Sequence, residues 1–297
     1  MVLALFLFAS VVNDVRSLVA AHDFAAADRE VRDYRARQGA TPELAAALSW
    51  LARGSLDAGQ FDRADSYAAE TRGLADQLLR SRKLDADSWL PTAIGASIEV
   101  HAQALAARGE LPQALEFLRL QLKLFAGTSI TERIRKNVNL LSLEGKPAPP
   151  LEVADWVGGS QPVPLASLHG HPVLLFFWAH WCGDCKAEVA ILARIRKTFE
   201  PQGLVIVAPT RYYGYVAGGA DAAPEVEKNY IDQVRRRYYS ELAGVAAPLS
   251  AVNFVTYGSS TTPTLVLIDP AGMVRMYHPG ALSESDLSAR IQTILKK

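Results

Sequence analysis

The sequence predicts two domains, an all-helical array over residues 13–143 followed by an α/β domain over residues 144–297. Residues 1–144 hold 3 of the 16 prolines and 7 of the 20 glycines, whereas residues 145–297 hold the other 13 and 13. Apolar residues recur at helical spacing in the first part, and continuous apolar runs of strand length occur in the second. The proline-rich stretch 144–150 cannot remain helical, so we place the domain junction there.

Composition narrows the classes of function. The 297-residue chain has 31 Lys and Arg against 31 Asp and Glu, so it carries no net charge that would favour nucleic acid. It has only two cysteines, which excludes a disulfide scaffold and a four-cysteine zinc site.

Residues 1–12 allow two interpretations. Val2–Ala9 is an unbroken apolar run that is too short to span a bilayer, which needs about 20 residues. It matches the apolar region of a secretory signal, although no Lys or Arg precedes it. The other interpretation is the start of a first helix. The first predicts an exported or periplasmic protein, and the second leaves a cytoplasmic location open.

The helical part contains a local pattern that occurs three times. A short polar turn precedes an aromatic residue or leucine, and an alanine follows three residues later: Phe24 with Ala27, Phe61 with Ala64, and Leu111 with Ala114. Alanines let paired helices approach closely, and the pattern resembles tetratricopeptide (TPR) hairpins. The spacings of 37 and 50 residues between these positions differ from the family repeat of about 34. We therefore predict TPR-like hairpins that serve either as a partner-binding surface or as a helical spacer or dimerising arm.

A βαβ unit is predicted in the second part of the chain. Pro172–Trp178 reads as a strand buried on both faces, Lys186–Phe199 as a helix, and Leu204–Ala208 as a second strand. This order predicts a parallel pair of strands with a right-handed crossover.

Cys182 and Cys185 lie where the first of these strands gives way to the helix. Unpaired N–H groups at a helix N-terminus favour an anion, so a thiolate is stabilised at Cys182. Cys185 lies three residues further on the same helical face, where it can attack a mixed disulfide formed at Cys182. The alternatives are an inert structural disulfide and a metal site completed by histidines such as His180, His169 and His171.

Four segments carry a family resemblance: Gly145–Leu151, Phe177–Lys186 with the two cysteines, Thr262–Asp269 and Ala271–Val274. They resemble, in the same order, segments of the thioredoxin superfamily, and more narrowly of its TlpA/ResA-like branch of exported thiol-disulfide oxidoreductases. The resemblance covers about residues 145–297. It implies a thioredoxin-like α/β sandwich and an enzyme that exchanges disulfides without a cofactor.

The resemblance also implies roles for individual residues. Cys182 matches the attacking thiol and Cys185 the resolving thiol, so the two form the redox-active disulfide. Pro263 matches the cis-proline that faces the dithiol, and Thr262 before it matches a residue whose backbone binds a substrate strand. Trp181 matches a substrate-binding tryptophan.

Residues around the two cysteines determine what we expect of proton transfer and of the redox direction. Glu188 matches an active-site glutamate that could relay protons for Cys185, the alternative being a solvated helix glutamate. Phe176 stands where thioredoxin has a buried aspartate. Asp184 places a negative charge near Cys182, which should raise the pKa of its thiol, and a less stabilised thiolate makes a better reductant. Lys186 opposes this effect with a positive charge nearby. We therefore expect a reductant.

The expected partners are protein dithiol or disulfide substrates, an upstream electron-donor thiol protein and a protein on the helical domain, with cytochrome c maturation as a candidate process. One alternative function is copper or haem delivery through the two cysteines. A peroxiredoxin-type peroxidase is disfavoured because Ala179 stands where that class has Thr or Ser. Between the βαβ unit and Thr262 we expect a flexible tyrosine-rich loop at 212–219 and a helix over about 225–242.

Overall fold

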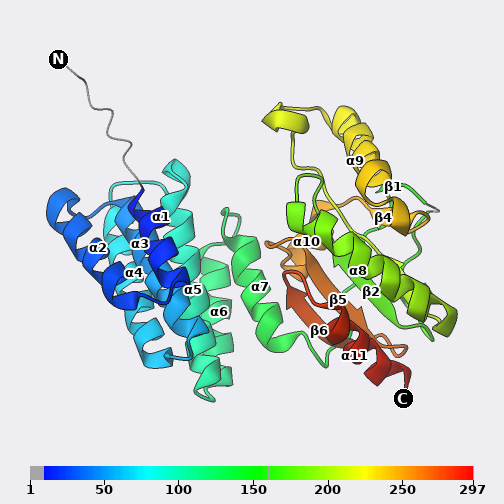
Figure 1. Ribbon diagram of the computed structural model, residues 1–297, viewed down its shortest axis with the longest axis horizontal. Coiled ribbons are helices and arrows are strands. Elements are labelled where there is room, and N and C mark those ends of the chain that lie inside the picture. Colours follow the sequence, from blue (N-terminus) through cyan, green and yellow to red (C-terminus); the bar gives the residue numbers. More distant parts are fainter. Residues whose placement is uncertain (1–9, 160, 297) are drawn as a thin grey trace. The chain divides into compact units, whose positions relative to one another are not determined.

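The computed structural model describes residues 10–159 and 161–296, which form two compact units that divide between Ile134 and Arg135 (Figure 1). The proposed signal run at residues 2–9 lies outside the described residues. Val11 and Val12 are buried in the first helix. Within the described ranges, no helix combines the length and apolar character needed to cross a membrane.

The first unit consists of helices that are joined by turns and short loops. In chain order, the helices that begin in it are α1 (Val11–Ala20), α2 (Phe24–Gln38), α3 (Pro42–Asp57), α4 (Phe61–Leu79), α5 (Trp89–Ala107), α6 (Leu111–Leu124) and α7 (Thr131–Ser142). The three turns predicted from the repeated pattern join α1 to α2, α3 to α4, and α5 to α6. Helical hairpins are therefore confirmed, and the TPR-like classification remains a prediction.

Small residues let these helices approach closely. Ala45, Ala46 and Ala47 on α3 are fully buried. A Cβ atom on Gly54 would lie 2.2 Å from Cγ1 of Val19, so α3 contacts α1 at a distance that only glycine permits. The alanine-rich composition of this part is thus explained by packing.

The second unit is built on a four-stranded sheet with the order β3-β2-β5-β6. Its strands are β2 (Val173–Phe177), β3 (Val205–Val207), β5 (Thr264–Ile268) and β6 (Val274–Pro279). β2 is parallel to β3 and antiparallel to β5, and β6 is antiparallel to β5. The predicted βαβ unit is confirmed, and all five residues of β2 are buried as expected for a central strand.

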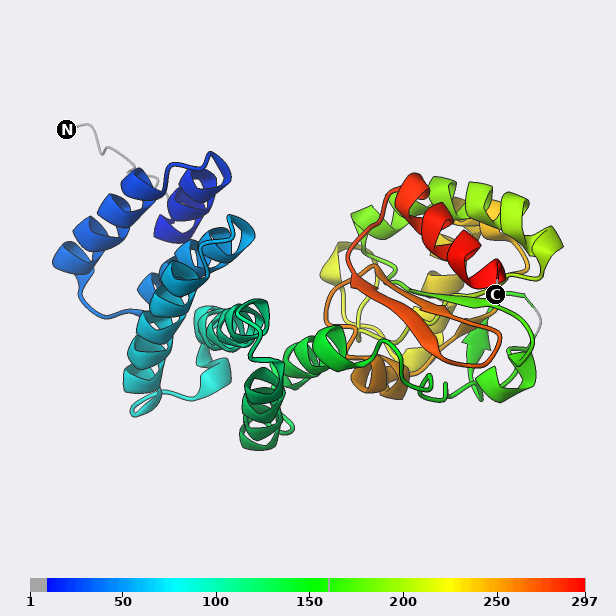
Figure 2. The same cartoon turned by 90° about the horizontal axis from the view of Figure 1, so that it is seen from below.

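Helices cover both faces of this sheet. α8 (Gly183–Phe199) and α11 (Glu284–Leu295) share a core with Leu174 and Phe176 on one face. α10 (Ala251–Tyr257) packs on the other face, where the Phe177 ring contacts Phe254 and Tyr257 at 5.3 and 5.1 Å between centroids. Figure 2 shows the light-green α8 and the red α11 together on one side of the sheet. This arrangement is the thioredoxin-like α/β sandwich that the resemblance implies.

An inserted segment between β3 and α10 contains α9 (Pro224–Tyr238) and β4 (Ala247–Pro248), which pairs with β1 (Trp156–Val157). The helix predicted over 225–242 ends at Tyr238, and a short 3₁₀ turn follows at Ser240–Leu242. The early end has a packing cause, because the ring of Tyr239 is buried at 4.6 Å from that of Trp178.

The division between the units lies within α7, before the predicted junction at 143/144. The C-terminal half of α7 belongs to the second unit because it packs on α10. Asn139 Nδ2 donates to the Thr256 carbonyl oxygen at 3.3 Å, and a Cβ on Gly258 would lie 2.4 Å from the Lys136 nitrogen. A helix that continues into the next unit leaves no turn signal in the sequence.

Candidate active site

Cys182 and Cys185 form a disulfide with Cα atoms 5.3 Å apart at the start of α8. Both cysteines are buried, and Cys182 is slightly more exposed, at 3% against 0% for Cys185. This difference suits an attacking role for Cys182 and a resolving role for Cys185.

The N-terminus of α8 provides an environment for a negative sulfur. Cys182 is the N-cap, and its Sγ accepts a hydrogen bond from the Cys185 backbone N–H at 3.0 Å. Once the disulfide is reduced, this donor and the helix dipole stabilise a thiolate on Cys182. The predicted position of the sulfur, where a buried strand leads into a helix, is confirmed.

The loop before β5 faces this disulfide. Cys182 Sγ lies 3.4 Å from the carbonyl oxygen of Thr262, and the Thr262–Pro263 peptide bond is cis, as the resemblance implies. Trp181 is 50% exposed beside the cysteines, although tryptophan is usually well buried. The structure thus brings together Trp181, Thr262 and Pro263 beside the disulfide, and their role in substrate binding remains a prediction.

Glu188 is buried on α8, one turn beyond Cys185, and is only 2% exposed. The alternative of a solvated glutamate is therefore wrong, and the role of Glu188 in proton transfer remains a prediction. Burial raises the pKa of the Glu188 carboxyl, and a hydrogen bond from the Leu282 N–H to Oε1 at 3.2 Å opposes the rise. A carboxyl with a raised pKa can exchange protons nearer neutral pH than an exposed one.

A second buried pair, which the sequence interpretation missed, joins the active-site loop to α9. His180 and Glu227 are each 1% exposed, and His180 Nε2 lies 3.2 Å from Glu227 Oε1. Burial lowers the pKa of His180, with Glu227 opposing the shift. The residues are 47 positions apart, and no periodicity or motif signals their pairing. The sequence interpretation considered His180 only as a candidate metal ligand.

We expected a flexible loop at 212–219, but hydrogen bonds fix the backbone of its first residues. Glu227 accepts hydrogen bonds from the backbone N–H groups of Tyr213 and Gly214 at 2.6 and 2.8 Å. Across the described residues, no three His, Cys, Asp or Glu side chains gather as a group able to hold a metal ion.

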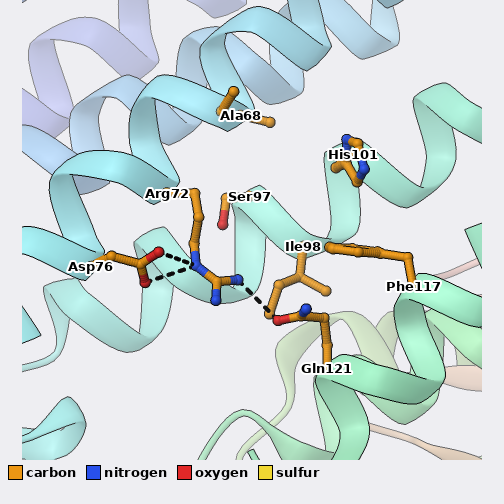
Figure 3. Close-up of a pocket in the computed structure, with 9 residues that line it drawn as sticks. Ala68, Arg72, Asp76, Ser97, Ile98, His101, Phe117 and Gln121 are labelled. Atoms are coloured by element: carbon orange, nitrogen blue, oxygen red, sulfur yellow. Dashed lines mark hydrogen bonds and ion pairs between the residues drawn. The ribbon is translucent and has the colours of Figure 1, made fainter. Parts of the chain in front are cut away.

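A cavity of about 360 Å³ lies among α4, α5 and α6 of the first unit (Figure 3). Arg72 crosses it, donating from Nε to the Asp76 carboxylate at 2.8 Å and from Nη1 to Gln121 Oε1 at 2.9 Å. The rings of His101 and Phe117 meet edge to face at 4.6 Å on its wall. The cavity thus combines an apolar wall with a charged group.

Comparisons with known proteins find relatives of the second unit. The model of the AhpC/TSA family matches residues 145–210. The thiol-disulfide oxidoreductase ResA of Bacillus subtilis is 31% identical over 146 residues, which cover 48% of this chain and 70% of ResA. The thiol:disulfide interchange protein DsbE of Xylella fastidiosa is 28% identical over 154 residues, covering 52% of this chain and 70% of that protein. A crystal structure of a DsbE-type protein from Chlorobium tepidum is 24% identical, covers 51% of this chain and 97% of that one, and has a TM-score of 0.39.

Proposed function

Because the chain belongs to the ResA-like family of thiol-disulfide oxidoreductases, we propose that it reduces disulfides in proteins through Cys182 and Cys185. The observation that carries this proposal is the position of Cys182. Its sulfur caps α8 and lies 3.4 Å from the Thr262 carbonyl oxygen beside the cis-proline, and Cys182 is the more exposed of the two cysteines.

The reaction begins with both cysteines reduced. The Cys182 thiolate attacks one sulfur of the substrate disulfide, which forms a mixed disulfide and releases the other substrate sulfur as a thiolate. Cys185 loses its proton, and its thiolate attacks the Cys182 sulfur. This step forms the Cys182–Cys185 disulfide and releases the second substrate sulfur. The substrate gains two electrons and two protons, and a donor dithiol protein must then reduce the enzyme again.

We propose that Glu188 accepts the proton that Cys185 loses. It lies on the same face of α8, three residues from Cys185, and burial raises its pKa, which makes the carboxyl a better proton carrier than an exposed glutamate. Phe176 is fully buried where thioredoxin has an aspartate, so this chain has no carboxyl at that position.

Replacement of each cysteine tests the proposal. Cys182→Ser should abolish the reduction of insulin disulfides, because no attacking thiolate remains. Cys185→Ser should accumulate mixed disulfides with native partners, because the second displacement cannot occur. Insulin turnover and mass spectrometry of trapped complexes measure the two effects. Wild-type turnover in both variants would contradict the proposal.

We also propose where the enzyme works and what it binds. Its membership of the ResA-like family supports export and a substrate in cytochrome c maturation. The cavity of the first unit supports a protein partner on the helical hairpins, since it offers an apolar wall and the Arg72 guanidinium to a polypeptide. Proteins trapped by Cys185→Ser would identify both the substrate and its compartment.

A further inference from the structure

The buried carboxylate of Glu227 collects three hydrogen bonds from two separate segments. Oε1 interacts with His180 Nε2 at 3.2 Å and with the Tyr213 N–H at 2.6 Å, and Oε2 accepts from the Gly214 N–H at 2.8 Å. A buried carboxylate is costly unless such donors satisfy it. The inserted helix α9 is therefore tied to the residue that lies two positions before Cys182.

Aromatic rings extend this network to the surface around the disulfide. The His180 ring meets the rings of Tyr213, Tyr215 and Tyr230 edge to face at 5.3–5.4 Å. Tyr213 in turn meets the half-exposed Trp181 edge to face at 5.6 Å. We call Tyr213 and Trp181 together the aromatic wall. The position of the aromatic wall depends on Glu227, because Glu227 accepts hydrogen bonds from the backbone N–H groups of Tyr213 and Gly214.

We propose that Glu227 and His180 are positioning residues that hold the aromatic wall as a docking surface for the polypeptide around a substrate disulfide. The inference rests on the proposed function. It means that the inserted segment makes the enzyme prefer protein disulfides to small disulfides. The ligand is a polypeptide with an apolar or aromatic side chain next to its disulfide. A small disulfide has no flanking chain that could lie on the wall.

Glu227→Gln tests the positioning role with little change in volume. Glutamine has one acceptor oxygen, and its NH₂ group would face a donor, so at least one of the three hydrogen bonds is lost. The measured quantity is the ratio of kcat/KM for insulin to kcat/KM for bis(2-hydroxyethyl) disulfide, a small disulfide that carries no ring. We expect this ratio to fall at least tenfold, chiefly through a higher KM for insulin. A parallel fall for both substrates, or an unchanged ratio, would overturn the inference.

Two substitutions at Tyr213 keep the test independent of the buried pair. Tyr213→Ala removes the ring and should lower the same ratio, whereas Tyr213→Phe keeps the ring and should restore most of it. If Glu227→Gln does not fold, these two variants decide the matter, and equal ratios in both would overturn the inference.

Val226→Ala is the matched control, since Val226 is the exposed neighbour of Glu227 on α9 and is 56% exposed. It should leave the ratio at the wild-type value, and a fall as large as that of Glu227→Gln would overturn the inference. Failure of the proposed function looks different. In that case, the wild-type enzyme itself would reduce neither substrate.

Discussion

At the scale of single residues, the site combines groups that local structure positions with groups that tertiary packing positions. Cys182, Cys185 and Pro263 lie in motifs, and a strand-to-helix junction places the first sulfur without reference to distant residues. The burial of Glu188 depends on tertiary packing, because Leu282 donates to it from 94 positions away. The pairing of His180 with Glu227 has the same cause and was not predicted.

The buried carboxyl of Glu188 makes stability depend on pH in a defined direction. Because burial raises its pKa above the ordinary 4.5, its contribution to stability is fully present below about pH 4.5 and is lost as the pH rises through the folded-state value. Glu188→Gln stays neutral and keeps an oxygen for the Leu282 N–H. The variant should therefore have a higher free energy of unfolding than the wild type at about pH 8, with the difference shrinking towards pH 4.

Urea-induced unfolding of the oxidised protein across this pH range measures the effect. Glu241→Gln, at an exposed position, is the control and should show a much smaller dependence on pH. If the advantage of Glu188→Gln grew as the pH fell, the raised pKa of Glu188 would be refuted. The same variant should slow disulfide turnover if Glu188 serves Cys185.

At the scale of elements, a continuous apolar run predicted the central strand β2 well, because all five of its residues are buried. β5 is also buried along its whole length, and it was predicted from the family resemblance of Thr262–Asp269. The end of α9 was not predicted, since it depends on the burial of Tyr239. The close contact between α7 and the end of α10 was also invisible in the sequence. Gly258 ends α10 with φ of +61° beside the backbone of Arg135 and Lys136.

Gly258→Ala should destabilise the protein through two effects. A left-handed conformation costs an alanine about 1–2 kcal/mol, and a Cβ 2.4 Å from the Lys136 nitrogen forces a backbone shift that costs about 1–3 kcal/mol more. Gly145→Ala is the matched control, because Gly145 has φ of +77° but no atom within 4 Å of its added Cβ. Urea-induced unfolding compares the two variants. Equal losses would show that the approach of α7 to α10 contributes nothing.

At the scale of the whole molecule, the uneven use of proline and glycine predicted a helical unit followed by an α/β unit. The helical hairpins were predicted because the second helix of each begins directly after a turn that has a local sequence signal, as at Phe24 and Phe61. The division at Ile134 and Arg135 was not, because α7 runs through it without a break. The cavity of the first unit was not predicted either, since it depends on how three helices pack.

If the helical unit binds a partner through that cavity, a change there should affect the choice of partner rather than the chemistry. Phe117→Ala removes an apolar ring from the cavity wall. In the Cys185→Ser background, it should lower the yield of trapped native complexes several-fold relative to trapped insulin. Quantitative mass spectrometry of the trapped species measures this ratio. Gln113→Ala, at an exposed position on α6, is the control, and an equal effect of the two changes would contradict the role of the cavity.

The course of α7 has a practical consequence for isolating the catalytic part of the protein. A recombinant fragment truncated at the proline-rich stretch would begin at Gly145 and would lack Asn139, which binds the Thr256 carbonyl, together with the backbone that lies against Gly258. Such a truncation would expose one end of α10 to water. A fragment that begins at Arg135 would retain this cover.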